Sequence, residues 1–261
     1  MAFDKNELIL DKVRSLAAHD LSTGEMLFRL TSLEDPNLTC TAEGEEVTDA
    51  VGAVITTLYR SKKATFSATN SLISLDLAAA QYGAKKEVAD TDAKILDYTY
   101  DILTVADGSA KLKHKPANKD DVKFIYSVEN GEVGKSFKAA AQASATEFVI
   151  DTEGVITVPT GLTGKIYVEY QFETENAVRI VNKASEFPEA CSVVIYAYFR
   201  DKCNENIVYS GKVICPKAKL NPESVELALT STGKHAFELT MMKDYCTEEG
   251  EDQLFTIIVA E

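Results

Sequence analysis

The 261-residue chain contains no tryptophan and only three histidines. His19, His114 and His235 fall in different expected elements, and none has a carboxylate or a second ligand at the spacing of a metal site. His235 follows a Gly233 turn, so we expect it at the surface. The chain also lacks GxSxG, P-loop and GxGxxG motifs. We therefore expect a protein that is not an enzyme and that uses no cofactor and no metal.

Basic residues are too few to balance the acidic ones. The chain has 27 Lys and Arg against 41 Asp and Glu, a net charge of -14. This balance argues against a simple nucleic-acid binder, whose footprint is normally basic, but it is compatible with a surface that repels nucleic acid. The segment 111–119 has four lysines around His114 but no arginine or aromatic residue, so we expect a solvated loop there.

Long apolar runs are missing as well, which indicates that no segment spans a membrane. The first residues, MAFDKNELIL, lack the basic and apolar regions of a signal peptide, so we expect synthesis in the cytoplasm. The five cysteines form no CxxC pair. We expect Cys40 and Cys215 to be buried as small apolar residues, and a disulfide remains an open alternative. The other cysteines are Cys191, Cys203 and Cys246.

What the chain does have is organised around residues 61–83, SKKATFSATNSLISLDLAAAQYG. Polar and apolar residues alternate around Phe66, which predicts a strand with one wet face. Asn70 or Ser71 could cap a helix that ends at Gly83. We expect this helix to pack on a sheet through Leu72, Leu75 and Leu77. An aspartate at Leu75 or Leu77 should then prevent folding, because it would bury an unpaired charge.

Most of the remaining sequence has strand character. Residues 191–200, CSVVIYAYFR, are apolar on both faces and should form a central strand. We expect the next strand to end at Pro216, which has no N–H to donate. The polar stretch 84–93 marks a boundary, and several strands between residues 95 and 172 indicate a small β-sandwich or a set of long hairpins.

Residues 43–63 form a long segment that we expect to be a loop, with acidic residues at one end and basic ones at the other. A head-to-tail contact between identical subunits would use such a pattern, and a solvated loop with ordinary charges would also show it. The apolar middle should be covered by another chain. The acidic residues are Glu43, Glu45, Glu46 and Asp49, the apolar ones Val51, Val54, Ile55, Leu58 and Tyr59, and the basic ones Arg60, Lys62 and Lys63.

The order of these elements resembles the tail tube, or major tail, proteins of bacteriophages. The resemblance rests on the hairpin with STGE, on residues 61–83, and on IYVEYQFETENAVRIVNKASEFPEA, VVIYAYFRDKC and CPKAKLNPESVELALTSTGKHAFELTMMKDYC. It implies a mainly β fold: a two-sheet sandwich or partial barrel with one flanking helix, whose inner sheet is shared between subunits in a hexameric ring. Stacked rings would form a channel through which DNA passes without specific binding, in the virion tail.

The resemblance also implies partners and a division of the chain. Besides other copies of the chain, the partners would be sheath, baseplate initiator and tape-measure proteins. Residues 1–83 and 164–261 would form the tube core, and residues 84–163 a β-rich elaboration or inserted subdomain. The four acidic residues of 43–49 would face the lumen or a contact between rings. The alternatives are another virion protein, such as a capsid decoration or head–tail connector module, and a carbohydrate- or protein-binding β-module.

Overall fold

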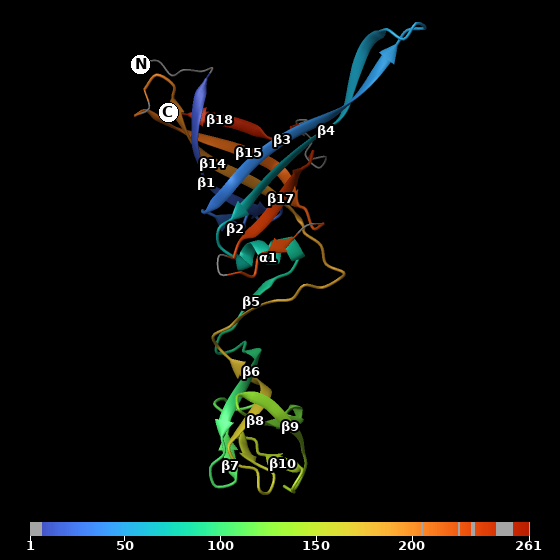
Figure 1. The fold of residues 1–261 in the computed structure, drawn as a ribbon. Helices are drawn as coiled ribbons and strands as arrows, with labels where there is room; N and C mark the ends of the chain where they lie inside the picture. Colours follow the sequence, from blue (N-terminus) through green and yellow to red (C-terminus); the bar gives the residue numbers. More distant parts are fainter. Residues whose placement is uncertain (1–6, 205, 224, 231–232, 244–252, 261) are drawn as a thin grey trace. The chain divides into compact units, whose positions relative to one another are not determined.

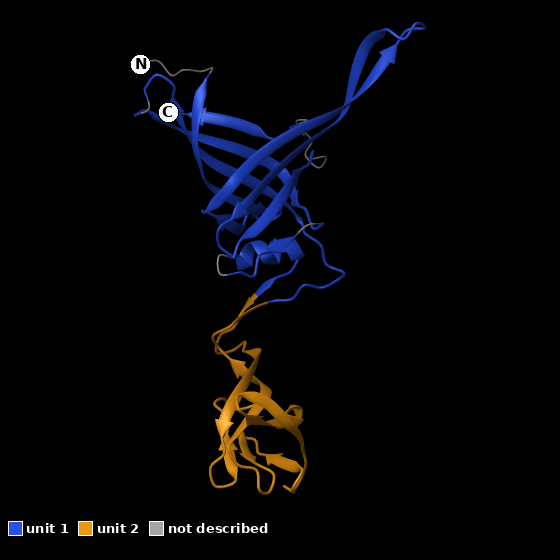
Figure 2. Ribbon diagram, viewed as in Figure 1, with its two compact units in different colours: residues 1–86, 180–261 blue, residues 87–179 orange. Residues whose placement is uncertain are grey.

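The chain consists of two units (Figure 2). The computed structural model describes residues 7–204, 206–223, 225–230, 233–243 and 253–260. Unit 1 comprises Met1–Lys86 and Ile180–Glu261, and unit 2 comprises Glu87–Arg179. Within the described residues, strands predominate and α1 (Leu75–Tyr82) is the one α-helix. The expectation of a mainly β protein with a single flanking helix is confirmed.

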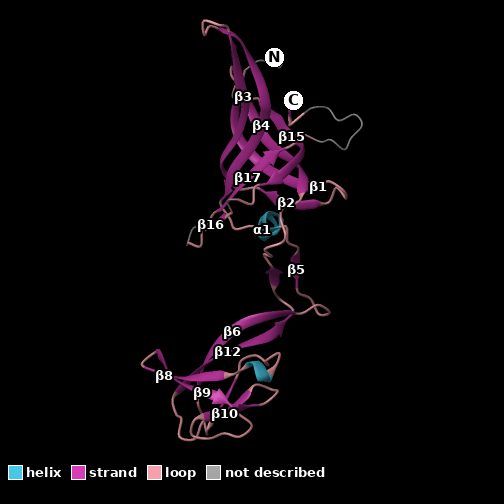
Figure 3. Cartoon of the chain, turned by 90° about the vertical axis from the view of Figure 1, so that its right-hand side faces the viewer, coloured by secondary structure: helices cyan, strands magenta, loops and turns pink. Residues whose placement is uncertain are grey.

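Unit 1 is built on one curled sheet that forms a nearly closed barrel (Figures 1 and 3). Its described strands follow the order β2-β1-β14-β15-β17-β4-β3, with β16 added to β17 and β18 added to β15. It is thus a partial barrel made of one continuous sheet, not two separate sheets. The bounds are β1 (Leu8–Asp20), β2 (Met26–Leu30), β3 (Leu33–Thr48), β4 (Val54–Asn70), β14 (Ala190–Asp201), β15 (Val208–Leu220), β16 (Glu226–Leu227), β17 (His235–Met241) and β18 (Thr256–Ala260).

Alternation along the central strands places every second side chain in the core of unit 1. Val193 and Ile195 of β14 point inward beside Cys215 of β15 and Leu239 of β17, and all four are buried. β14 lies between β1 and β15, so its expected central position is confirmed. Because successive side chains of a strand point to opposite faces, one face of the sheet carries these buried apolar residues.

β15 does not end at Pro216. It continues to Leu220, and the register with β14 shifts between the pairs Cys191–Ala218 and Val193–Cys215. Pro216 therefore lies at a β-bulge, where a residue without an N–H costs no ladder hydrogen bond. Beyond the bulge, β15 exchanges one neighbour for another: residues 210–214 pair with β18, and residues 218–220 pair with β17.

α1 begins later than the sequence indicates. β4 continues to Asn70, so neither Asn70 nor Ser71 caps the helix. Ser74 is the N-cap instead, and its hydroxyl accepts a hydrogen bond from the Leu77 N–H at 3.3 Å. Gly83 ends the helix with a left-handed φ of 65°, and a Cβ there would lie 2.2 Å from the Phe187 carbonyl oxygen. Only glycine suits both demands.

Only one of the three leucines expected to pack the helix is buried. Leu77 is 0 % exposed within the core, whereas Leu75 is 47 % exposed and Leu72 lies before the helix, in the exposed connection. The expectation was wrong because it placed the N-cap at Asn70 or Ser71, whereas the helix begins after Ser74. The expectation that Leu75→Asp prevents folding is therefore withdrawn.

His235 is buried, contrary to the surface position expected from the nearby turn. Its Nδ1 accepts a hydrogen bond from the Ser74 N–H at 3.4 Å, and its Nε2 lies 2.5 Å from Gln81 Oε1. The Gln81 amide in turn donates to the Ala236 carbonyl at 3.2 Å. These contacts specify a neutral ring that donates from Nε2, and burial lowers the pKa of His235.

Unit 2 forms a second sheet with its own core. The described strands follow the order β6-β12-β8-β9-β10-β11-β7. Ile125, Phe148, Ile156 and Ile166 are fully buried between them. The elements are β6 (Ile95–Thr104), β7 (Ser109–Lys111), η1 (Lys119–Asp121), β8 (Phe124–Glu129), β9 (Glu132–Ala139), β10 (Glu147–Ile150), β11 (Val155–Thr157) and β12 (Lys165–Thr174).

The boundaries of unit 2 differ from those expected from the sequence. Residues 164–179 were assigned to the tube core, but they belong to unit 2. The reason is pairing: β12 runs antiparallel to β6 from Lys165 opposite Thr104 to Thr174 opposite Ile95, and it also pairs with β8. Because hydrogen-bonded strands cannot be separated into different cores, the boundary falls after β12.

A buried acid fastens β6 to the following loop in unit 2. Asp101 Oδ2 accepts hydrogen bonds from the Lys113 N–H at 2.9 Å and the Tyr170 hydroxyl at 2.8 Å. Burial alone would raise the pKa of Asp101, but these bonds and the Lys113 ammonium at 3.1 Å together lower it. The same burial raises the pKa of Tyr170 to about 12. Asp101 is thus a paired structural carboxylate.

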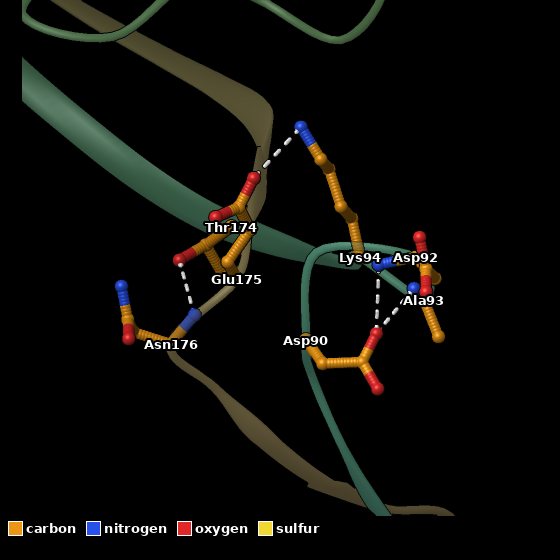
Figure 4. A network of polar contacts seen from close by, with 7 residues as sticks. All are labelled: Asp90, Asp92, Ala93, Lys94, Thr174, Glu175 and Asn176. Carbon is orange, nitrogen blue, oxygen red and sulfur yellow. Dashed lines mark hydrogen bonds and ion pairs between the residues drawn. The ribbon is translucent and has the colours of Figure 1, made fainter.

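The two segments that enter and leave the unit 2 sheet lie side by side (Figure 4). The Asp90 carboxylate accepts from the N–H groups of Asp92 at 2.8 Å and Ala93 at 2.7 Å. Lys94 and Glu175 form an ion pair at 3.1 Å between the segments. Next to them along the chain, β5 (Lys86–Val88) pairs with β13 (Val178–Ile180), so unit 2 is inserted between α1 and β14 through two neighbouring strands.

Substitutions at Leu77 and Leu75 test where the helix contacts the core. Leu77→Ala should lower the free energy of unfolding by about 2–5 kcal/mol, because it leaves a cavity at a fully buried site. Leu75→Ala serves as the matched control and should change it by about 0.5 kcal/mol or less. Urea denaturation followed by circular dichroism measures both. Equal losses at the two positions would contradict the helix placement.

The buried His235 should make unit 1 less stable in mild acid. Its folded-state pKa is lowered, so the unfolded chain takes up the proton first, near pH 6.5. As the pH falls through and below this value, protonation therefore favours the unfolded chain, and this loss of stability is absent at higher pH. The free energy of unfolding should fall less steeply from pH 7 to pH 5 in His235→Gln than in the unchanged protein. Parallel pH profiles would show that His235 is not the group responsible.

Candidate assembly interface

The long hairpin β3–β4 extends beyond the rest of the sheet as an arm (Figure 1). β4 pairs with β17 only from Ala64 to Asn70. The part before that, residues 54–63, pairs with β3 alone and reaches roughly 33 Å at about 3.3 Å per residue. We refer to residues 42–63 as the arm. The segment expected to be a loop is thus a regular hairpin. Because both faces of this hairpin are exposed, its sequence does not alternate between apolar and polar residues, and so it gave no sign of strands.

The hairpin register places the acidic and basic residues of the arm next to each other. Glu43 lies opposite Arg60, and Arg60 Nη2 is 3.5 Å from Glu45 Oε2. Both side chains of this pair are largely exposed, so the ion pair contributes at most about 1 kcal/mol. The acidic and basic residues are therefore not at opposite ends of the arm, because the hairpin folds one half of the segment back on the other.

Apolar side chains are unusually exposed along the arm. Val51 is 89 % exposed and Tyr59 is 75 % exposed, and Val47, Val54, Ile55 and Leu58 are exposed as well. The Tyr59 ring lies beside Gly44, where an added Cβ would come within 3.3 Å of it. A two-stranded ribbon without a covered face is marginally stable in water by itself. Such a surface is typical of a segment that becomes covered in an assembly.

The turn at the end of the arm is ordered by Asp49. Its carboxylate accepts hydrogen bonds from the N–H groups of Val51 at 2.9 Å and Ala53 at 2.8 Å, and its own N–H donates to the Ala53 carbonyl at 2.9 Å. Gly52 completes the turn with a φ of 84°. Asp49 therefore has a local structural role that the other three acidic residues of the arm do not share, and it presents Val51 at the outermost point.

The sheet of unit 1 has an open edge at β3. In the described part of the sheet, β3 pairs with β4 on one side and with no strand on the other. Pro36, the positive φ of 48° at Asp35 and the register shift between Glu34 and Asn37 interrupt the start of this edge. Residues 37–41 are regular and offer unpaired backbone groups. An open regular edge is a template for pairing with another chain.

A second set of exposed apolar residues was not singled out from the sequence. It belongs to the ends of β1, β15 and β18, and its members are Ile9, Leu10, Val208, Ile257 and Ile258. No sequence signal separates such residues from core residues, because isoleucine and leucine in a strand normally indicate burial. Only the pairing of the strands shows that their side chains remain uncovered in the single chain.

Other chemistry is limited in the described residues. No group of three or more His, Cys, Asp or Glu side chains there could hold a metal ion. Cys191 and Cys215 are buried free thiols, whereas Cys40 and Cys203 are exposed, so the burial expected for Cys40 is wrong. Burial raises the pKa of Cys215 to about 12. Cys246 lies outside the described residues. In the described part of the chain, no helix has the length and apolar character to cross a membrane.

Unit 1 is thus a mainly β unit with a curled sheet, an open edge at β3 and a projecting arm. Comparison with protein families gives the class to which the chain belongs. The model of the YomU/Tube protein family matches residues 8–252, and the chain belongs to this phage tube-type family. The resemblance to phage tail tube proteins is thereby confirmed, and the chain is a phage structural protein of the tube class. A search of curated proteins found no match.

Proposed function

We propose that this protein is the subunit of a phage tail tube, in which hexameric rings stack around a channel for DNA ejection. The proposal rests mainly on one observation, the open regular edge of β3 in a chain that belongs to a tube family. Pairing of this edge with a neighbouring subunit would continue the sheet around a ring. Closing a sheet removes exposed edges, which otherwise favour uncontrolled aggregation.

In this proposal, the arm joins one subunit to the next subunit or ring. The arm is long and apolar at its end, and its hydrogen-bonded turn holds Val51 outward. Burial of exposed apolar side chains provides the main favourable free energy of association. Glu43, Glu45 and Glu46 lie along the same arm, where they can face the lumen or a contact between rings. The ion pair between Glu45 and Arg60 would be stronger in an interface that excludes water.

The net charge supports a channel that DNA passes without binding. An excess of acidic residues, -14 over the chain, repels phosphates over roughly a Debye length of about 8–10 Å. The proposed role needs no catalysis and no cofactor. Baseplate initiator, tape-measure and, in contractile tails, sheath proteins are the proposed partners, and the virion tail is the proposed location.

Negative-stain electron microscopy of the concentrated full-length protein tests this function. The protein, alone or with added phage baseplates, should form hollow rods or six-fold rings. Val51→Asp should abolish or strongly reduce these assemblies while the free energy of unfolding changes by about 0.5 kcal/mol or less, because Val51 contacts little within its own chain.

Val133→Asp provides the matched control, since Val133 is also an exposed valine beside a hairpin turn, but in unit 2. This variant should assemble normally. Dispersed particles both with and without baseplates would contradict the tube proposal and favour a decoration or connector protein. Normal rods from Val51→Asp would show that the end of the arm takes no part in assembly.

A further inference from the structure

One face of unit 2 carries a cluster of aromatic side chains that the tube function does not explain. β6, β12 and β8 are neighbours in the sheet, and their outward residues form this face. Tyr98 and Tyr100 of β6 are 63 % and 59 % exposed, and Phe124 of β8 is also exposed. Tyr167 of β12 lies opposite Tyr126 of β8. We refer to these five residues as the aromatic face.

The four tyrosine rings of the aromatic face are held by hydrogen bonds or ring contacts. Glu169 of β12 accepts a hydrogen bond from the Tyr98 hydroxyl at 2.6 Å on one oxygen and from the Tyr167 hydroxyl at 2.5 Å on the other. The rings of Tyr100 and Tyr167 stack with centroids 5.4 Å apart. Tyr126 packs against Tyr167 with centroids 6.2 Å apart. The hydrogen bond to Glu169 raises the pKa of Tyr167 to about 12, and its hydrogen bond to Glu169 also raises the pKa of Tyr98.

A cavity of about 310 Å³ lies at this face. Tyr98, Phe124 and Tyr126 contribute aromatic surface to it, and Glu169 lies between them. Asp121, Lys123 and Gln171 add groups that donate and accept hydrogen bonds, and Tyr170 completes the lining. The volume is at the lower end of the range for small-ligand sites, about 300–1,000 Å³.

The chemistry of this lining selects among ligand classes. A saccharide ring has an apolar face of C–H groups that packs on an aromatic ring, and a rim of hydroxyl groups that both donate and accept hydrogen bonds. Aromatic rings also stack on nucleic-acid bases, but such sites track the phosphates with a basic groove. Here the carboxylates Glu169 and Asp121 are accompanied by the single cation Lys123 among the lining residues. Charge therefore disfavours a polyanion and favours an uncharged, hydroxyl-rich ligand.

Preorganisation of the rings lowers the cost of binding a ligand that packs on them. Binding normally costs about 0.5–1.5 kcal/mol for each flexible side chain that becomes ordered. The Tyr98 and Tyr167 hydroxyls already donate to Glu169 in the free protein, so these side chains lose little conformational entropy when a ligand binds. We propose that the aromatic face and its cavity bind a segment of a neutral glycan chain. This site would act in addition to tube assembly and does not depend on it.

A glycan array probed with the labelled full-length protein tests the proposal. The array carries neutral glycans together with sialylated and sulfated ones. At least one neutral glycan should be retained, and isothermal titration calorimetry with that glycan should give saturable binding. Tyr98→Ala and Phe124→Ala should each weaken binding by about tenfold or more, because each removes a stacking surface. Tyr98→Phe keeps the ring and should restore most of the affinity.

Tyr59→Ala is the matched control, since it removes another exposed tyrosine, which lies in the arm of unit 1, and it should leave glycan binding unchanged. Circular dichroism should give the same spectrum for all variants, because the substituted rings lie outside the core of unit 2. The proposal is overturned if no neutral glycan is retained or if only anionic glycans bind. It is also overturned if folded Tyr98→Ala and Phe124→Ala bind as well as the unchanged protein, or if the aromatic face mediates contact between protein copies instead.

Discussion

Unpaired backbone groups at the edge of a curled sheet are the constraint on which this structure depends. A strand satisfies its N–H and C=O groups on both sides only where it has two neighbours, and β3 has one among the described strands. Proline and a register shift interrupt the start of β3, and acidic residues line its outer half, yet residues 37–41 remain regular. This combination limits pairing to a short stretch, which gives a partner strand a defined place.

The sequence predicted elements with one covered face better than elements with none. Residues 191–200 are apolar on both faces, so β14 was identified together with its central position. The arm carries exposed residues on both faces and shows little alternation, so it was expected to be a loop. Similarly, Ser74 was passed over as the cap because the extent of β4 is decided by its pairing with β17, which is remote in sequence.

The candidate interface could be predicted in composition but not in geometry. The sequence singled out Val51 and Tyr59 as residues for another chain to cover; both are exposed in the single chain, and their coverage by another chain stays a prediction. The pairing of Arg60 with Glu45 was not foreseen, because it arises only when the hairpin brings the two halves together. The open edge of β3 depends on the order of all strands, and tertiary pairing of that kind has no local sequence signal. The aromatic face of unit 2 could not be predicted from the sequence either, because it depends on the register of β6, β12 and β8.

The central claim is that the open edge of β3 pairs with another subunit, and hydrogen exchange of its backbone amides tests this most directly. Exchange would be measured by mass spectrometry on peptides that cover residues 37–41, in the single chain and in assembled rods. Amides on the open side should exchange rapidly in the single chain and become strongly protected on assembly, whereas the peptide over the buried α1 should change little. If residues 37–41 exchange equally fast in both states, the sheet does not continue between subunits and the account is contradicted.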